Sequence, residues 1–538
     1  MSGRYLIIIL LFFGCILPIF FVILRGNFIG MTITELQQQY AAHPNMAVMK
    51  RLLKDTSVQT VFCGGLCASA ASLFSSVLVQ EGGCPFVFIL GDLEEAGYFY
   101  HDLTQILGTE RVLFFPSSFR RSIKYGQKDA ANEILRTEVL SRLQKGEEGL
   151  CIVTYPDALA EKVVSRKELS NKTLKLNVGE KVDTTFITDV LHSYGFEYVD
   201  YVYEPGQYAV RGSIIDVFSF ASEYPYRIDF FGDEVESVRT FEVESQLSRE
   251  KKDGVSIVPD LAVTGDVTTS FLDFIPKETT LAMRDFLWLR ERIQVVHDEA
   301  LTPQAIAVQE AEENGGITLE GKLIDGSEFT VRALDFRRLE FGNKPTGTPN
   351  ASVTFNTSAQ PIFHKNFDLV ASSFKDYLEK GYSLYICSDS MKQTDRIKAI
   401  FEDRGDKINF TPVERTIHEG FVDNTLRLCI FTDHQLFDRF HKYNLKSDKA
   451  RSGKVALSLK ELNQFTPGDY VVHTDHGIGR FSGLVRIPNG DTTQEVLKLV
   501  FQNEDVVFVS IHSLHKVSKY KGKEGEAPRL NKLGTGAW

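Results

Sequence analysis

The sequence predicts a multi-domain α/β protein that ends in a small β-rich unit. The chain has 538 residues, of which 43% are hydrophobic and 24% are charged, as is typical of globular domains. That length predicts about three or four domains. Short apolar runs alternate with longer helical stretches from residue 58 to residue 154, which is the pattern of a parallel sheet covered by helices. Near the C-terminal end, several short strands follow one another instead.

Charge and cysteine usage favour protein partners and a reducing compartment. The net charge is −11, whereas a chain that wraps duplex DNA by itself usually carries a basic surplus. The seven cysteines are scattered, and most lie in apolar runs, so we interpret them as reduced thiols of a cytoplasmic protein. Cys63 and Cys67 are four apart, but no second Cys/His pair stands at zinc-ligand spacing near them, and we predict no metal there.

The first thirty residues differ from the rest of the chain. Residues 5–24 are almost wholly apolar, long enough to cross a bilayer, and flanked by Arg4 and Arg25. Met31 begins an ordinary globular start, with Thr32 or Thr34 able to cap a helix at residues 35–40. Residues 1–30 are therefore interpreted as an over-extended start of the gene, with a membrane anchor as the alternative.

A first domain, residues 31–155, is predicted from this alternation. Strands are expected at residues 58–63, 85–90, 111–115 and 149–154, and helices at residues 70–79, 92–107 and 129–143. The first strand leads through Gly64 and Gly65 into a helix, where a phosphate-binding loop would lie. Counting from Gly65 puts Ala70 at the second Gly, Ala71 at the Lys and Ser72 at the hydroxyl residue of the motif. Without the Lys, the loop is interpreted as a tight turn or a degenerate nucleotide site.

The middle of the chain divides less clearly. Residues 156–205 are predicted to be a small α+β insertion, with strands at 174–179 and 198–204 around a helix at 185–193. Residues 206–365 continue the first domain, with antiparallel strands within 207–218 and 226–243, a helix at 281–296 and a loop at 342–349. Residues 366–462 form a second small α/β domain and a linker, with helices at 367–379 and 391–404, strands at 383–387 and 426–431, and a polar, basic stretch at 442–454.

Residues 463–528 predict a C-terminal barrel similar to SH3 or Tudor modules, followed by a linker start at residues 529–538. Strands are expected at 470–473, 484–487, 494–502 and 506–511, with turns at Asn489-Gly490 and Asn503-Glu504-Asp505. Two histidine pairs, His473 with His476 and His512 with His515, have a spacing that does not converge on a metal in strands or turns. The sequence shows no intact Walker A motif, no DEAD-type box and no catalytic triad that can be singled out.

Two strings resemble a family. Residues 211–216 (RGSIID) and 227–234 (RIDFFGDE) resemble the helicase-like module shared by the repair protein UvrB and the transcription-repair coupling factors, the Mfd family. The degenerate loop at Gly65 favours the coupling factors. So do residues 114–120, which stand where UvrB has a long tyrosine-rich hairpin that this sequence lacks. Residues 468–481 (GDYVVHTDHGIGRF), 508–510, 514–515 and 530–534 look like the RNA-polymerase-interacting domain of that family.

The resemblance implies two protein partners. Its polymerase-interacting domain adds a strand to the β subunit of RNA polymerase, and residues 496–500 are a suitable strand, with Leu497 and Leu499 as contacts. Its insertion recruits UvrA through basic residues, for which Arg166, Lys175 and Lys181 are the candidates here.

In the family, ATP and Mg²⁺ drive a translocase on double-stranded DNA through two further lobes that this sequence does not show. We therefore expect a monomeric recruitment platform without cofactors or ATPase activity of its own. The alternatives are a UvrB-type helicase-like ATPase that uses the Gly65 loop, and a membrane-anchored adaptor.

Overall fold

A computed structural model describes most of the chain. The described residues are 30–81, 83–118, 130–243, 245–261, 268–302, 321–439, 441, 443, 466–473, 476–489, 492–510, 517–520 and 528–532. The apolar start, most of the 442–454 stretch, the pair His512 and His515, and the end of the tail lie outside them.

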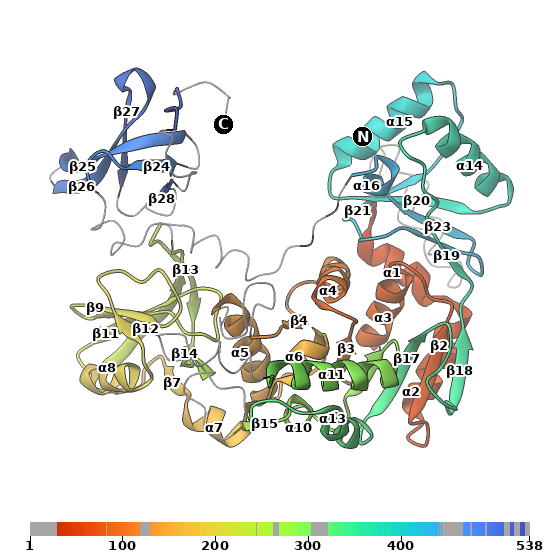
Figure 1. Cartoon of the computed structure of the whole chain (residues 1–538), viewed down its shortest axis with the longest axis horizontal. Coiled ribbons are helices and arrows are strands. Elements are labelled where there is room, and N and C mark those ends of the chain that lie inside the picture. The colour runs from red at the N-terminus through yellow and green to blue at the C-terminus, as the bar shows by residue number, and fades with distance from the viewer. Residues whose placement is uncertain are drawn as a thin grey trace, which may run out of the picture.

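The first α/β domain is built on a seven-stranded parallel sheet (Figure 1). Five of the strands, at residues 60–64, 86–89, 112–115, 151–154 and 280–283, are almost wholly buried, as expected where helices cover both faces, whereas those at 337–342 and 351–354 are partly polar and partly exposed. Along the sheet they are β18 (Ala351–Thr354), β2 (Thr60–Gly64), β17 (Arg337–Gly342), β16 (Thr280–Met283), β3 (Phe86–Ile89), β5 (Cys151–Thr154) and β4 (Val112–Phe115). The predicted parallel sheet is confirmed, and residues from the middle of the chain supply three of its strands.

The helices of this domain begin at the caps that the sequence shows. Thr32 and Glu35 form a capping box at the start of α1 (Ile33–Ala41), and Asp92 caps α4 (Leu93–Leu107). The other helices are α2 (Pro44–Lys54), α3 (Ala70–Glu81), α5 (Ala130–Gln144), α6 (Pro156–Ala160), α7 (Arg166–Asn171), α10 (Phe271–Phe274), α11 (Phe286–Ala300) and α13 (Gly326–Ala333). Two short strands, β6 (Val163–Val164) and β15 (Thr268–Thr269), pair with each other.

The single helix predicted at residues 281–296 is wrong at its start. Residues 280–283 are strand β16, and Asp285 then caps α11 with its side chain on the N–H of Trp288. β16 lies between β17 and β3, where all four of its residues are buried. Apolar residues run from the strand into the helix without a change of pattern, so periodicity alone does not separate them.

An interaction module, defined here as residues 174–257, projects from the first domain as a largely antiparallel unit with two hydrophobic clusters. It contains β7 (Leu174–Asn177), α8 (Thr184–Ser193), β8 (Glu197–Tyr198), β9 (Gln207–Arg211), β10 (Ile214–Val217), β11 (Tyr226–Phe231), β12 (Glu234–Phe241), β13 (Ser248–Lys252) and β14 (Gly254–Ile257). β7 pairs with β14, and a core from Leu176 to Ile257 joins them to α8. The module therefore runs past residue 205, where the sequence suggested a division, and the strand expected at 198–204 is only residues 197–198.

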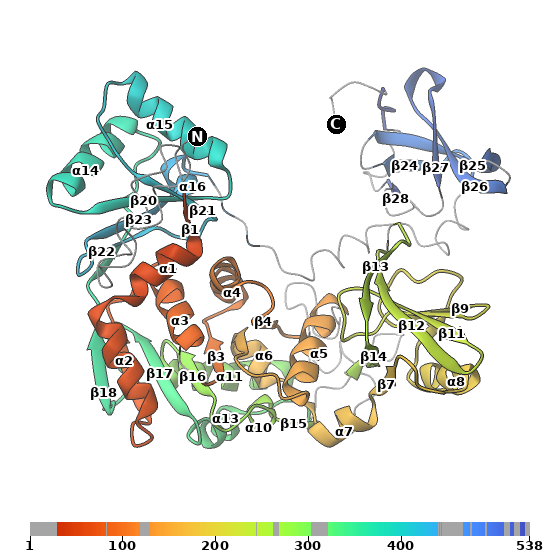
Figure 2. The same ribbon diagram turned by 180° about the vertical axis from the view of Figure 1, so that it is seen from behind.

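The second α/β domain takes its edge strand from the start of the chain. Its sheet has the order β1 (Met31–Thr32), β21 (Thr411–Glu414), β20 (Ser383–Ser388), β23 (Leu428–Thr432), β22 (Phe421–Asp423) and β19 (Thr357–Ala359). Three helices belong to it, α14 (Phe367–Glu379), α15 (Met391–Asp403) and α16 (Asp433–Leu436). Figure 2 shows α1, α3 and α4 between this domain and the seven-stranded sheet.

The C-terminal unit is a five-stranded antiparallel sheet. Its order is β27 (Val506–Ser510), β26 (Thr492–Val500), β25 (Gly477–Asn489), β24 (Tyr470–His473) and β28 (Val517–Lys519). Asn503 and Glu504 adopt left-handed backbone conformations in the turn between β26 and β27, where the sequence predicts a turn. The predicted β-rich C-terminal unit is thus confirmed as an antiparallel sheet.

Candidate functional sites

The loop at the phosphate-binding position joins β2 to α3, as the sequence predicts. Gly65 has a φ of +78°, and a Cβ there would lie 2.0 Å from the carbonyl oxygen of Phe355. Glycine is therefore required both by the left-handed backbone and by the close approach of a neighbouring chain segment. Ala70, Ala71 and Ser72 form the first turn of α3, and Ala71 leaves the lysine position without a charge.

The backbone groups of this loop are hydrogen-bonded to the second α/β domain and the segment leading into it. The N–H of Cys67 donates to Thr357 Oγ1 (3.1 Å), and that hydroxyl donates to the carbonyl oxygen of Gly65 (2.7 Å). The N–H of Ser69 donates to the carbonyl oxygen of Glu419 (3.3 Å), whose own N–H donates to Ser69 Oγ (3.0 Å). Two of the N–H groups that would cradle a phosphate in an intact loop, those of Cys67 and Ser69, are therefore already paired within the chain.

A buried carboxylate stands beside the same loop. Asp102 of α4 is 1% exposed and accepts the N–H of His418 at 2.6 Å. The hydroxyls of Ser69 and Ser72 also hydrogen-bond to it. Burial nevertheless raises the pKa of Asp102 to about 7, because desolvation of the charged form outweighs these hydrogen bonds. Ser72, at the position that binds Mg²⁺ in an intact loop, thus has a protein carboxylate as its partner.

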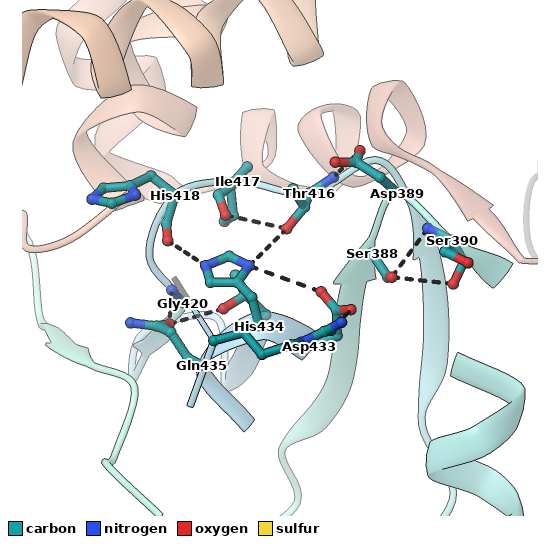
Figure 3. Close-up of polar contacts among 12 residues, drawn as sticks. Ser388, Asp389, Ser390, Thr416, Ile417, His418, Gly420, Asp433, His434 and Gln435 are labelled. Carbon is teal, nitrogen blue, oxygen red and sulfur yellow. Dashed lines mark hydrogen bonds and ion pairs between the residues drawn. The ribbon is translucent and has the colours of Figure 1, made fainter. Parts of the chain in front are cut away.

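Histidines gather where the two α/β domains meet, and Figure 3 shows two of them, His418 and His434. His434 Nε2 lies 2.8 Å from the carbonyl oxygen of His418, so Nε2 carries the proton. Rings of His101, His434 and His441 pack together, with centroids of His441 4.9 Å from His101 and 4.5 Å from His434. Burial lowers the pKa of His101, His418 and His434 to about 4, so the rings are neutral at pH 7. Across the described part of the chain, no three His, Cys, Asp or Glu side chains are grouped to hold a metal ion.

Arg166, predicted as a partner-binding residue, has a structural role. Its guanidinium hydrogen-bonds to the carbonyl oxygens of Leu143 and Phe274 and lies over the Phe274 ring at 4.7 Å. Burial lowers its pKa. It therefore ties α7 to α5 and α10 although the residue is exposed, and its role in partner binding stays a prediction.

Lys175 and Lys181 are both exposed, but they face different surroundings. Lys175 lines a cleft of about 510 Å³ between the interaction module and α5, together with Glu110, Glu138 and Glu147. Lys181 lies beside the turn between β11 and β12, where its backbone bridges to Glu234. Lys181 is thus the better placed of the two for an outside partner.

An exposed phenylalanine marks this turn of the interaction module. Phe231 is 80% exposed at the end of β11, and Gly232 makes the turn with a φ of +63°. The segment of residues 178–182 runs alongside, because the N–H groups of Gly179 and Val182 donate to Val235 and Asp233. Val178 in that segment is 45% exposed, and Asp233 and Glu234 are exposed beside Lys181, so an apolar surface of mixed charge forms here. Sequence alternation predicted the strands but did not show which apolar residue faces solvent.

In the C-terminal sheet, Leu497 and Leu499 belong to the core. Both are 0% exposed and pack with Val471, Phe481 and Val509. Their strand β26 is hydrogen-bonded on both sides, to β25 and to β27, so it has no free edge for strand addition. The prediction that these two leucines contact a partner directly is therefore corrected.

The outward face and edge of this sheet belong to β27. Phe508 is 51% and Val506 is 39% exposed, and they alternate with the inward-facing Val507 and Val509. In the described part of the sheet, β27 is the terminal strand, paired only with β26. The period-2 alternation was visible in the sequence, but the choice of face was not.

Two family models match parts of the chain. The UvrB interaction domain matches residues 174–262, and the CarD-like/TRCF RID domain matches residues 465–521. The transcription-repair-coupling factor of Bacillus subtilis (strain 168) is 23% identical, and that of Staphylococcus aureus (strain USA300) is 22% identical. Each alignment covers 88% of this chain and 46% of the relative, so the chain spans about half the length of the curated relatives it matches.

The chain is similar over most of its length to the transcription-repair-coupling factors. The two domain matches fall on two units of the fold, the interaction module and the C-terminal sheet. The match to the interaction domain also spans residue 205, in agreement with the hydrophobic cluster that runs from Leu176 to Ile257.

The tail beyond the second match completes the C-terminal sheet. Asn531 donates its backbone N–H to the carbonyl oxygen of Ile478 and accepts the Ile478 N–H on its side-chain oxygen. Gly477 has a φ of +76°, and a Cβ there would lie 2.6 Å from the Asn531 side chain. Asn531, in the string at residues 530–534 that carries the resemblance, therefore packs on the start of β25.

Among the residues that the structure describes, no helix is both long enough and apolar enough to span a membrane. The apolar residues 5–24 lie outside that set.

Proposed function

We propose that this chain couples transcription to DNA repair by binding two proteins at once. The C-terminal sheet binds the β subunit of RNA polymerase, and the interaction module binds UvrA. The observation that carries the proposal is the presence of both matched domains in one chain, each with an exposed apolar residue on a well-packed scaffold. Both partners work in the cytoplasm, where we expect this chain to act as a monomer.

Polymerase binding is proposed at the edge strand β27. We infer that the five strands close into an SH3- or Tudor-like barrel whose free edge is β27, and that a strand of the polymerase adds there. Backbone N–H and C=O groups of an edge strand supply affinity in such contacts, and alternate side chains supply specificity. Phe508 and Val506 are the outward side chains, and Leu497 and Leu499 support them from below.

UvrA binding is proposed at the turn between β11 and β12. Phe231 supplies an aromatic anchor of the kind that dominates interface energetics, and Lys181 supplies a neighbouring charge. Lys175 contributes less, because it lies in the cleft against α5 among glutamates.

The test exploits two exposed phenylalanines that serve as matched controls for each other. Binding of purified chain to the polymerase β subunit and to UvrA is measured by biolayer interferometry for wild type, Phe508→Arg and Phe231→Arg. We expect Phe508→Arg to lose polymerase and keep UvrA, and Phe231→Arg to do the reverse. A wild-type chain that binds neither partner contradicts the proposal, and so does a pair of variants with identical profiles.

Basic residues of the module are tested in the same assay. Lys181→Glu should weaken UvrA binding about tenfold or more, because the new carboxylate either repels acidic groups of the partner or loses its water in the interface. Lys175→Glu should change the affinity little. Arg166→Gln should leave UvrA binding unchanged while lowering the stability of the first domain, because carbonyl groups lose their partners.

The alternative of a UvrB-type ATPase has less support. The loop lacks the lysine, its N–H groups are paired with Thr357 and Glu419, and Asp102 adds a carboxylate that opposes a phosphate. We therefore expect no DNA-stimulated phosphate release in a malachite-green assay of this chain. Duplex DNA is expected to bind weakly to a chain whose net charge is −11.

A further inference from the structure

The degenerate phosphate loop is the place where the two α/β domains interlock. Gly65, Cys67 and Ser69 hydrogen-bond to Thr357 and Glu419, which stand about 290 to 350 residues later in the chain. Phe355, just before Thr357, donates its N–H to the carbonyl oxygen of Gly64 and lies against Gly65. These contacts are reciprocal, because Ser69 both donates to and accepts from the backbone of Glu419.

Asp102 of α4 belongs to the same hydrogen-bond network between the loop and the second domain. It accepts the N–H of His418 and the hydroxyls of Ser69 and Ser72, so one carboxylate binds the loop, α3 and the second domain together. The aromatic face of Tyr98, one turn earlier on α4, stacks on the His418 ring. Apolar residues continue the contact, since Cys387, Val413 and Ile417 of the second domain are buried in the core of the first.

We propose that the phosphate loop of this chain has become the socket of an interdomain joint, in which Thr357 and the backbone of residues 418–419 take the hydrogen bonds that a nucleotide phosphate would take. The socket accounts for three features that a mere turn does not require. The first is a glycine with a carbonyl group against it, the second is a serine that bonds in both directions, and the third is a buried aspartate facing the loop.

The joint is a property beyond the binding of two partners, because it fixes the relative position of the two α/β domains to which their binding sites are attached. The interaction module is inserted in the first α/β domain, and the C-terminal sheet follows the second in sequence. A closed socket makes the two α/β domains one body. A nucleotide therefore cannot open and close them relative to one another, as it does with the lobes of an ATPase.

Hydrogen exchange measured by mass spectrometry tests the joint on the full chain. Ser69→Ala removes the acceptor of the Glu419 N–H, and Thr357→Val removes the acceptor of the Cys67 N–H with little change of shape. Each change lies on one side of the joint and should speed exchange about tenfold in a peptide on the other side, residues 416–421 for Ser69→Ala and residues 66–72 for Thr357→Val. Ser75→Ala is the matched control, because Ser75 lies on α3, six residues after Ser69, and its buried hydroxyl makes no hydrogen bond within the described part of the chain. Unchanged exchange across the joint in both variants overturns the proposal.

A second variant asks whether the socket is closed to nucleotide, independently of any loss of stability. Ala70→Gly combined with Ala71→Lys restores the motif residues that the sequence lacks. If the socket is filled by the second domain, this variant shows no heat of binding with Mg-ATP by calorimetry, and its exchange at residues 416–421 matches the wild type. Saturable Mg-ATP binding to the restored variant overturns the proposal, whatever the polymerase and UvrA assays show.

Discussion

The ring of Tyr98 stacks on the ring of His418, with centroids 3.5 Å apart and planes 11° from parallel. Tyr98 belongs to α4 of the first α/β domain, and His418 belongs to the segment of the second domain that reaches the phosphate-loop position. The stack therefore joins two domains through a titratable ring. The titratable groups around His418 are the rings of His101, His434 and His441, and the Asp102 carboxylate accepts the His418 N–H.

Replacing His418 by phenylalanine should make the free energy of unfolding depend less on pH below pH 7. The folded pKa of His418 is about 4, below its ordinary value of 6.5, so the unfolded chain binds more protons between those values. Stability from this residue is present above pH 6.5 and is lost as pH falls toward 4. Wild type should lose about 1–2 kcal/mol more than His418→Phe between pH 7 and pH 5, after allowance for partial exposure.

Urea unfolding of both proteins at the two pH values measures this difference. His192→Phe on the exposed face of α8 is the control and should track the wild type. Parallel profiles for His418→Phe and wild type contradict the assignment of a buried neutral ring.

Replacing Asp102 by asparagine should act with the opposite sign. The folded pKa of Asp102 is raised to about 7 from 3.8, so the folded chain holds the extra proton between these values. Stability from this group is present at low pH and is lost as pH rises through the window from 4 to 7. Wild type should therefore lose about 1–2 kcal/mol relative to Asp102→Asn when pH rises from 5 to 7. The same unfolding series checks it, and a wild type that gains stability relative to the variant over that range contradicts it.

Gly65→Ala should be far more damaging than Gly212→Ala. Both glycines have positive φ, +78° and +62°, but only Gly65 has a carbonyl oxygen 2.0 Å from the position of a Cβ. The shared left-handed backbone costs about 1 kcal/mol in each variant, and the steric clash should add about 2 kcal/mol or more at Gly65. Thermal unfolding with circular dichroism compares the two, and equal losses would show that the Phe355 segment moves away freely.

Leu499→Ala and Phe508→Ala should separate the core of the C-terminal sheet from its outward face. Truncation of the fully buried Leu499 should cost about 2–5 kcal/mol, whereas truncation of the half-exposed Phe508 should cost about 1 kcal/mol or less. Hydrogen exchange of the peptides within residues 477–510 reports the local stability in the full chain. Leu499→Arg, which would bury an unpaired charge, should unfold the sheet rather than only block a partner. Comparable exchange in both alanine variants would place Leu499 outside the core.

Much of the element order could be predicted because its signals are local. The apolar run before Gly64 became β2, and helix α4 began one residue after Asp92, since strand apolarity and helix caps act over a few residues. The resemblance of two short strings to a family likewise needed only the strings themselves, and both fall within the matched domains.

Pairings across the chain were beyond the sequence for a physical reason. Whether Leu499 or Phe508 faces a partner depends on the side of β26 and β27 on which the core lies. The alternation of apolar residues looks the same whichever face is buried, so it does not identify that side. Strand β16 is apolar like the helix after it, and only its place between β17 and β3 makes it a strand. Asp102 and the N–H of His418 are 316 residues apart, so no local pattern predicts that they meet. Composition and short motifs showed the resemblance and most elements, whereas burial and long-range hydrogen bonds, which exist only in the folded chain, decided which residues are surface, core or joint.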